Sequence, residues 1–298
     1  MTPYLPDGVS QELYPFTGKF ITLKSGARLH YLDEGGGKPV VMIHGNPSWS
    51  FYYRNLALAL RDGRRVIAPD HIGCGLSDKP GDDRYEYTLR SRVDDLEFLL
   101  DSLGVKEHIT LVVHDWGGMI GLAYAARHPE RIEKLVLLNT GAFLLPAGKS
   151  FPAALRLCRT PLGAALIRGF NAFVRGAAWV GCKRRRMSRE LRNAYAAPYN
   201  SWASRIATLR FVEDIPLSPG DRAYPLVKET QEKLNSLSAL PTLICWGLKD
   251  FVFDRHFLEE WKRRFPGAEL HSFPDCGHYI LEDAREEVIP LIKRFIEK

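Results

Sequence analysis

An aspartate between a predicted strand and a predicted helix is the strongest candidate nucleophile in this chain. Residues 108–113 are mostly apolar and β-prone, and residues 119–130 carry Ala and Leu at helical spacing. The turn between them is His114-Asp115-Trp116-Gly117-Gly118. On such an elbow a carboxylate lies beside the positive end of the helix, where it can displace a leaving group from carbon and form an ester. By itself the pattern also fits a solvated aspartate in a turn.

A carboxylate nucleophile needs hydrogen-bond donors for the negative charge that develops during the reaction. The loop His44-Gly45-Asn46-Pro47 follows the apolar strand 40–43 and precedes the helix-like run 51–60. In a strand-loop-helix unit of this kind, the loop gives one backbone N–H to an oxyanion hole. The backbone N–H of Trp116, directly after the candidate nucleophile, is the second candidate donor.

A general base and a residue that orients it are also required. His278 follows the predicted strand 269–273, and Asp250 follows the predicted strand 241–245. Either residue alone is equally well explained as a surface histidine or a turn aspartate. Together with Asp115 they stand in the order nucleophile, acid, histidine, each after a strand, which is the order in α/β-hydrolases. We therefore predict a catalytic triad of Asp115, Asp250 and His278.

These motifs resemble those of the haloalkane dehalogenase family of α/β-hydrolases over nearly the whole chain. They are His44-Gly45-Asn46-Pro47, Asp70-His71-Ile72-Gly73-Cys74-Gly75, the Asp115 elbow and Gly277-His278. One departure is Val113, which occupies the first glycine position of the Gly-x-nucleophile-x-Gly pattern. The resemblance implies an α/β-hydrolase fold: a mostly parallel eight-stranded sheet, helices on both faces and an inserted helical cap. It also implies that the side chains of Asn46 and Trp116 donate N–H groups to the departing anion.

The alternation of strands and helices stops after the predicted sixth strand, which ends at Leu138-Asn139-Thr140-Gly141. Since the family inserts its cap at this point, we predict a core domain of residues 1–144 and 238–298 and a cap of residues 145–237. The chain is expected to end in a helix over residues 283–298. One dehalogenase branch takes its triad acid from the end of the sixth strand, but no acid stands there, so Asp250 remains the candidate.

Two cap segments, 194–203 and 210–217, resemble the β-lactone decarboxylases of bacterial long-chain olefin biosynthesis. This resemblance implies removal of carbon dioxide from cis-3,4-dialkyl oxetan-2-ones to give cis-alkenes. Tyr-Ala-Ala-Pro within the first segment also occurs in ordinary dehalogenases, so haloalkane dehalogenase is the alternative function. Apolar side chains of the cap are expected to enclose two alkyl chains, namely Phe151, Leu155, Leu162, Phe170, Phe173 and Trp179.

Three further functions are less well supported. Epoxide hydrolases share the elbow but carry an aromatic residue in place of Asn46, and they protonate the epoxide through cap tyrosines, for which Tyr195 and Tyr199 are candidates. Fluoroacetate-type dehalogenases have Arg in place of Trp116. A non-catalytic receptor with this fold is disfavoured by the complete triad.

Composition and length fit a single α/β domain with a cap, at 298 residues and 45% hydrophobic content. The five cysteines are scattered and odd in number, which favours a protein of a reducing compartment. Their spacing does not indicate a metal site, and no cofactor is expected. The chain has no apolar run of membrane-spanning length, and residues 1–12 are polar rather than signal-like. We therefore expect a cytoplasmic protein.

The cap is strongly basic. Residues 145–210 contain thirteen Lys and Arg against one acid, Glu190, whereas the whole chain has a net charge of +6. The densest run is Lys183-Arg184-Arg185-Arg186. A solvated surface is one interpretation, and nucleic-acid binding lacks any accompanying motif. The pattern favours peripheral contact with an anionic membrane, or docking onto an acidic enzyme of the same pathway.

Overall fold

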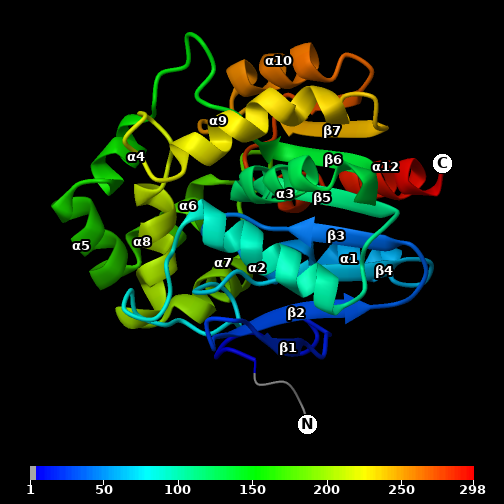
Figure 1. Ribbon diagram of the computed structural model, residues 1–298. Coiled ribbons are helices and arrows are strands. Elements are labelled where there is room, and N and C mark those ends of the chain that lie inside the picture. The colour runs from blue at the N-terminus through cyan, green and yellow to red at the C-terminus, as the bar shows by residue number, and fades with distance from the viewer. Residues whose placement is uncertain (1–4) are drawn as a thin grey trace.

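Short runs rich in Val, Ile and Leu form the central strands of one eight-stranded sheet (Figure 1). The computed structural model describes residues 5–298; residues 1–4, which begin the predicted core domain and the polar N-terminal stretch, lie outside the described residues. The strands are β1 Lys19–Thr22, β2 Arg28–Glu34, β3 Pro39–Ile43, β4 Arg65–Pro69, β5 Ile109–Asp115, β6 Ile132–Thr140, β7 Thr242–Gly247 and β8 Glu269–Phe273.

The strand order is β1-β2-β4-β3-β5-β6-β7-β8. Strand β2 is antiparallel to both of its neighbours, and all other neighbouring pairs are parallel. The strand order switches at β3, because β4 lies on one side of it and β5 on the other. In open α/β sheets, ligands bind at the carboxyl ends of the parallel strands beside such a switch point. The predicted fold is confirmed.

Helices lie on both faces of the sheet, and a further group lies over the carboxyl ends of the parallel strands (Figure 1). The α-helices are α1 Arg54–Leu60, α2 Leu89–Ser102, α3 Trp116–Arg127, α4 Ala153–Cys158, α5 Pro161–Phe170, α6 Ala172–Val180, α7 Arg189–Ala196, α8 Ile206–Glu213, α9 Tyr224–Lys233, α10 Arg255–Arg264, α11 Ile280–Asp283 and α12 Arg285–Glu297. The short 3-10 helices are η1 Ser50–Tyr53, η2 Pro129–Arg131, η3 Ala197–Tyr199, η4 Ala203–Arg205 and η5 Leu234–Leu237. Among the described helices, none combines the length and apolar character needed to cross a bilayer.

The core consists of two apolar layers, one on each face of the sheet. Successive side chains of a strand point to opposite faces, so Val41 and Ile43 of β3 pack with α2 and α3, whereas Val40 and Met42 pack with α1 and α12. Both faces of the central strands are therefore buried, and their carboxyl ends are held rigidly below the cap.

Helices α4 to α8 lie between β6 and β7 in the chain and form the group at the left of Figure 1. Helix α9, although it falls within the predicted cap range 145–237, packs against α3 on the face of the sheet. The exact boundary between core and cap stays a prediction. We use "cap" below for helices α4 to α8 and their connections.

Candidate active site

The chain turns sharply at Asp115, which ends β5 and is followed directly by α3. Its backbone has φ 54° and ψ −128°, a conformation that non-glycine residues seldom adopt and that is found where the surroundings enforce it. A Cβ on Gly117 would lie 1.9 Å from the carbonyl oxygen of Ile43, and one on Gly45 would lie 2.1 Å from Asp115 Oδ1. These two glycines allow the elbow to lie directly against the loop after β3.

Val113, which departs from the glycine pattern of the elbow, is accommodated by a glycine in α3. A Cβ on Gly121 would come within 2.7 Å of Val113 Cγ1. The close approach of strand and helix is therefore kept, with the glycine on the helix instead of the strand.

Gly117→Ala is expected to lower the thermal midpoint, because the added methyl group would have to displace the backbone at Ile43. Overpacking of this kind costs about 1–3 kcal/mol, which corresponds to a fall of roughly 2–12 °C for a domain of this size. Gly267→Ala is the matched control, since no atom lies within 4 Å of its added Cβ. Differential scanning calorimetry of the three proteins checks this; equal midpoints would contradict the geometry of the elbow.

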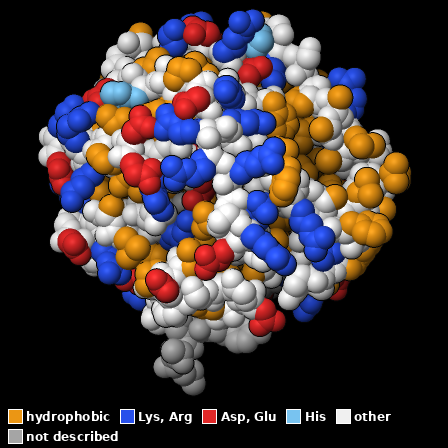
Figure 2. Space-filling view, turned by 180° about the vertical axis from the view of Figure 1, so that it is seen from behind, with side chains coloured by type: hydrophobic (Ala, Val, Ile, Leu, Met, Phe, Trp, Pro, Cys, Tyr) orange, Lys and Arg blue, Asp and Glu red, His pale blue; other side chains and the backbone are white. Residues whose placement is uncertain are grey.

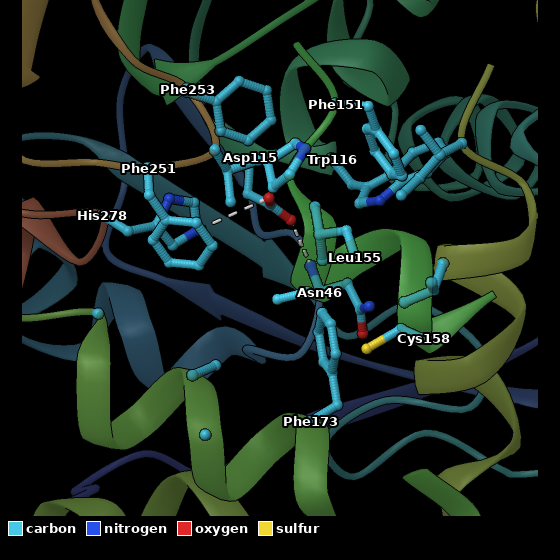
Figure 3. A pocket seen from close by; sticks show the side chains of 18 of the residues that line it. Asn46, Asp115, Trp116, Phe151, Leu155, Cys158, Phe173, Phe251, Phe253 and His278 are labelled. Atoms are coloured by element: carbon cyan, nitrogen blue, oxygen red, sulfur yellow. Dashed lines mark hydrogen bonds and ion pairs between the residues drawn. The ribbon is translucent and has the colours of Figure 1, made fainter. Parts of the chain in front are cut away.

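The two oxygens of the Asp115 carboxylate have different surroundings (Figure 3). Oδ1 accepts a hydrogen bond of 2.6 Å from the backbone N–H of Asn46. Oδ2 lies 3.7 Å from Nε2 of His278. Burial raises the pKa of Asp115 to about 6, against the lowering effect of His278 and of the backbone N–H groups of Trp116 and Asn46. Oδ2 is therefore the oxygen free to react, and it remains ionised at neutral pH.

His278 is held from behind by a buried carboxylate. Its Nδ1 donates to Oδ2 of Asp250 at 2.7 Å. Burial alone would lower the pKa of His278, but the carboxylates of Asp250 and Asp115 outweigh it and raise the pKa above its usual value. Asp250 is itself fixed by backbone N–H groups of Val252 and Phe253. The structure thus brings the three predicted triad residues together.

Asn139 supports this arrangement and was not predicted. It lies at the end of β6 with a φ of 35°. Its Nδ2 donates to Asp250 Oδ2 at 3.1 Å and to the carbonyl of Gly247 at 3.0 Å, while its Oδ1 accepts from the backbone N–H of Gly247. Asn139 stands at the β6 end that carries the triad acid in one dehalogenase branch, and here it fixes the acid that comes from β7.

Asn46 and Trp116, which are predicted to donate hydrogen bonds to the departing anion, both line the pocket beside Asp115. Asn46 Nδ2 donates one hydrogen to the carbonyl of Thr208 in α8 at 3.1 Å, which leaves its second hydrogen for a ligand. The Trp116 ring packs on the Phe211 ring, with centroids 5.3 Å apart. The buried guanidinium of Arg92 lies over the same Phe211 ring, 3.6 Å from its centroid. Core and cap therefore position both donors jointly.

A cavity of about 380 Å³ extends from Asp115 into the cap. Its walls are mainly apolar, and Figure 3 shows Phe151, Leu155 and Phe173 around it. The prediction that these three side chains enclose the substrate is confirmed in position. It is wrong for Leu162, Phe170 and Trp179, which are exposed on the outside of the cap. Helices α5 and α6 carry apolar residues on both faces, so sequence alone did not separate the inner side from the outer side.

Tyr195 and Tyr199, the candidate proton donors of an epoxide hydrolase, do not belong to the described residues that line this cavity. Both are buried elsewhere: Tyr195 donates to Glu282 at 2.7 Å, and Tyr199 donates to the carbonyl of Ser48 at 3.1 Å. They fix the cap to the core, which removes the main support for an epoxide hydrolase.

The geometry agrees with the comparisons to known proteins. The family described as alpha/beta hydrolase fold matches residues 38–284. The chain belongs to the α/β-hydrolase family. Among solved structures, this α/β-hydrolase is similar to haloalkane dehalogenase DbeA from Bradyrhizobium elkani (TM-score 0.82, 27% identity, 95% of this chain and 98% of the other). Haloalkane dehalogenase DatA from Agrobacterium tumefaciens, at 23% identity, shares the fold (TM-score 0.85, 97% and 99% of the two chains).

Curated relatives narrow the resemblance. The α/β-hydrolase is 64% identical to cis-3-alkyl-4-alkyloxetan-2-one decarboxylase of Shewanella oneidensis, over 95% of this chain and 89% of the relative. It is 49% identical to the enzyme of the same name from Xanthomonas campestris, over 96% and 97%. Haloalkane dehalogenase 2 of Mycobacterium tuberculosis is 33% identical, over 95% and 96%. The resemblance to the decarboxylase branch is confirmed.

Proposed function

We propose that this α/β-hydrolase is a lyase that removes carbon dioxide from cis-3,4-dialkyl oxetan-2-ones and releases cis-alkenes. The observation that carries the proposal is an apolar cavity built around an Asp115–His278–Asp250 arrangement, in a chain 64% identical to a decarboxylase named for this substrate. The apolar walls suit the two alkyl groups, since each buried methylene contributes about 0.8 kcal/mol.

In the reaction that fits this geometry, Asp115 Oδ2 attacks the ring carbon that bears the lactone oxygen. The carbon–oxygen bond breaks, the substrate becomes an ester of Asp115, and the ring oxygen leaves as part of a carboxylate. The N–H groups of Asn46 and Trp116, both in the cavity wall, bind that carboxylate. The carboxylate then leaves as carbon dioxide, its electron pair forms the double bond, and Asp115 is released. No water is consumed and no net proton is transferred.

The site also permits initial attack on the lactone carbonyl, in which Oδ2 bonds to the carbonyl carbon, the C=O π bond breaks, and its electron pair forms an oxyanion that the same donors bind. In either route His278, oriented by Asp250 and 3.7 Å from Oδ2, stabilises the charge on Asp115. The roles of all five residues, Asp115, His278, Asp250, Asn46 and Trp116, are part of the proposal.

Haloalkane dehalogenase is the second candidate, because the same five residues serve it equally well. Asp115 would displace a halide, and His278 would activate water to hydrolyse the alkyl ester. The two functions are separated by giving the purified protein a long-chain β-lactone and, separately, short 1-bromoalkanes. We expect rapid loss of the lactone and slow halide release, because a short haloalkane leaves most of the apolar cavity unfilled. Rapid halide release with an unchanged lactone would make the protein a dehalogenase.

The value of kcat/KM is expected to increase with pH through about 6, because only ionised Asp115 attacks and its pKa is raised to about 6 by burial. Below that value kcat/KM should fall by about tenfold per pH unit. Steady-state rates between about pH 5 and pH 8 test this, and a flat profile would contradict an ionised carboxylate nucleophile.

The proposed reaction also implies a place in a reaction sequence. Its substrate is a β-lactone, so the preceding reaction must close that ring on a 2-alkyl-3-hydroxy acid, and its product is a long-chain olefin. We propose that the protein works with the enzymes of such an olefin pathway, on the cytoplasmic side of the inner membrane. Genes for acyl ligase-like, reductase-like and thiolase-like enzymes beside its own would support this placement; their absence would count against it.

A further inference from the structure

Large apolar side chains are exposed on the outside of the cap, on the side of the molecule shown at the right of Figure 2. Four of them are more than half exposed: Phe170 71%, Leu162 63%, Trp202 57% and Trp179 52%. Leu162 and Phe170 belong to α5, Trp179 belongs to α6, and Trp202 contacts the end of α5 near Gly169. We call this group, with the arginines described next, the outer cap surface.

Arginine side chains lie across the exposed indoles of this surface. The guanidinium of Arg168 is 4.9 Å from the Trp202 ring centroid, and those of Arg192 and Arg186 are 4.6 and 5.4 Å from the Trp179 ring. Arg156 and Arg175 are also exposed on α4 and α6. Within residues 5–298, no acid lies within ion-pairing distance of any of these five arginines. Their positive charge is therefore available to a ligand.

Some of the other cap cations are already paired with acids. Arg184, in the densest basic run, pairs with Asp275 and Glu287 of the core. Arg159 pairs with Asp221, and Arg210 pairs with Asp82 and Glu213. Arg184, and Arg210 through Asp82, connect the cap to the core. Within residues 5–298, Lys183, Arg185 and Arg189 are exposed and have no acid within ion-pairing distance, so the positive charge offered to a ligand comes from this basic run as well as from the arginines beside the exposed tryptophans.

The cavity reaches this surface. Leu157 of α4 and Val180 of α6 line the cavity and are also exposed, at 47% and 38%. An apolar molecule leaving a bilayer pressed against the outer cap surface would therefore meet apolar side chains without crossing water.

We propose that the outer cap surface binds an anionic lipid bilayer and admits the substrate from it. Protein surfaces at a membrane interface are typically rich in tryptophan and basic residues, because indoles lie at the headgroup level and cations pair with anionic lipids. The acidic side chains of a protein partner would pair with the cations, but they would make no favourable contact with Leu162 and Phe170, which are 63% and 71% exposed. The binding itself is independent of the reaction; the admission of substrate rests on the proposed function.

Vesicle binding of the full chain tests the proposal. Vesicles of phosphatidylcholine with one-third phosphatidylglycerol are compared with pure phosphatidylcholine, by co-sedimentation and by tryptophan emission. A change in tryptophan emission reports on the outer cap surface, because Trp179 and Trp202 are exposed whereas the other four tryptophans are buried, namely Trp49, Trp116, Trp246 and Trp261. We expect binding to the anionic vesicles at least tenfold tighter than to the neutral ones, a shift of the emission to shorter wavelength, and release by high salt.

Three variants locate the contact. Phe170→Ser with Trp179→Ser, and Arg156→Gln with Arg175→Gln and Arg186→Gln, should each weaken binding to anionic vesicles at least tenfold. The matched control is Phe20→Ser with Arg28→Gln on β1 and β2, an aromatic residue 49% exposed beneath an arginine, which should bind like the wild type. All three should turn over detergent-dispersed substrate at the wild-type rate, because none of the changed residues lines the cavity.

Equal sedimentation with anionic and neutral vesicles, or wild-type binding by both cap variants, would overturn the proposal. No binding to any vesicle would do the same and would leave an acidic protein as the occupant of the surface. Vesicle binding is measured without substrate, so an inactive protein that binds as expected would contradict the proposed function and not the docking.

Discussion

Asp115→Ala is expected to abolish turnover of the β-lactone while the protein stays folded. Among residues 5–298, Asp115 supplies the only carboxylate that both lines the cavity and lies beside His278, and its burial makes no large contribution to the core. Loss of a covalent catalyst typically lowers kcat by several orders of magnitude, roughly 10⁴-fold or more. Steady-state kinetics and the thermal midpoint of the two proteins are the measurements. More than about a tenth of the wild-type activity would remove Asp115 as the nucleophile.

Asp95→Asn is the matched control for this experiment. Asp95 is a second carboxyl whose pKa burial raises to about 6, and it accepts a hydrogen bond from Tyr85, but it lies in α2 outside the cavity wall. It should retain wild-type activity. Asp115→Asn separates an enzyme from a receptor with the same fold, because binding of the lactone should survive in it while turnover is lost.

Asn46→Ala and Trp116→Phe are each expected to slow the reaction by roughly ten- to a thousandfold, the range for loss of one donor to a developing anion. Asn46→Ala keeps the backbone N–H that holds Asp115 Oδ1 and removes only the side-chain donor. Trp116→Phe keeps an aromatic ring against Phe211 and removes only the indole N–H. Because the donors act on charge that develops in the transition state, kcat should fall more than KM increases.

The matched control for the second variant is Trp179→Phe, at a tryptophan exposed on the outside of the cap. It should be as active as the wild type. If Asn46→Ala and Trp116→Phe also react at the wild-type rate, the anion is held by other groups and the roles taken from the dehalogenase family do not apply to these two positions.

The core and the positions of the candidate site residues were predictable because they depend on short-range signals. Each of Asp115, Asp250 and His278 follows a run of buried β-prone residues, and parallel strands bring such ends to one edge of the sheet. The structure places all five candidate site residues around one cavity or directly behind it. Their family motifs are local as well, so one sequence was sufficient to find them.

The parts that could not be predicted depend on contacts between distant segments. Asn139 is held by hydrogen bonds with Gly247 and Asp250, at and just after the end of β7, more than one hundred residues away in the chain. Arg184 is charged like its neighbours, but only the fold places Asp275 and Glu287 beside it. Helix α9 has the amphipathic pattern of a cap helix and packs on the sheet instead, and the two apolar faces of α5 gave no sign of which one is inside.

The products formed from a purified cis-3,4-dialkyl β-lactone test the central claim most directly. Gas chromatography of the organic phase and carbon dioxide measured in the gas phase give the stoichiometry. A lyase that uses Asp115 without water should release cis-alkene and carbon dioxide in equal amounts, with no 3-hydroxy acid. If the lactone instead gives the 3-hydroxy acid without alkene, water has opened the ring and the protein is a hydrolase, which would contradict the account.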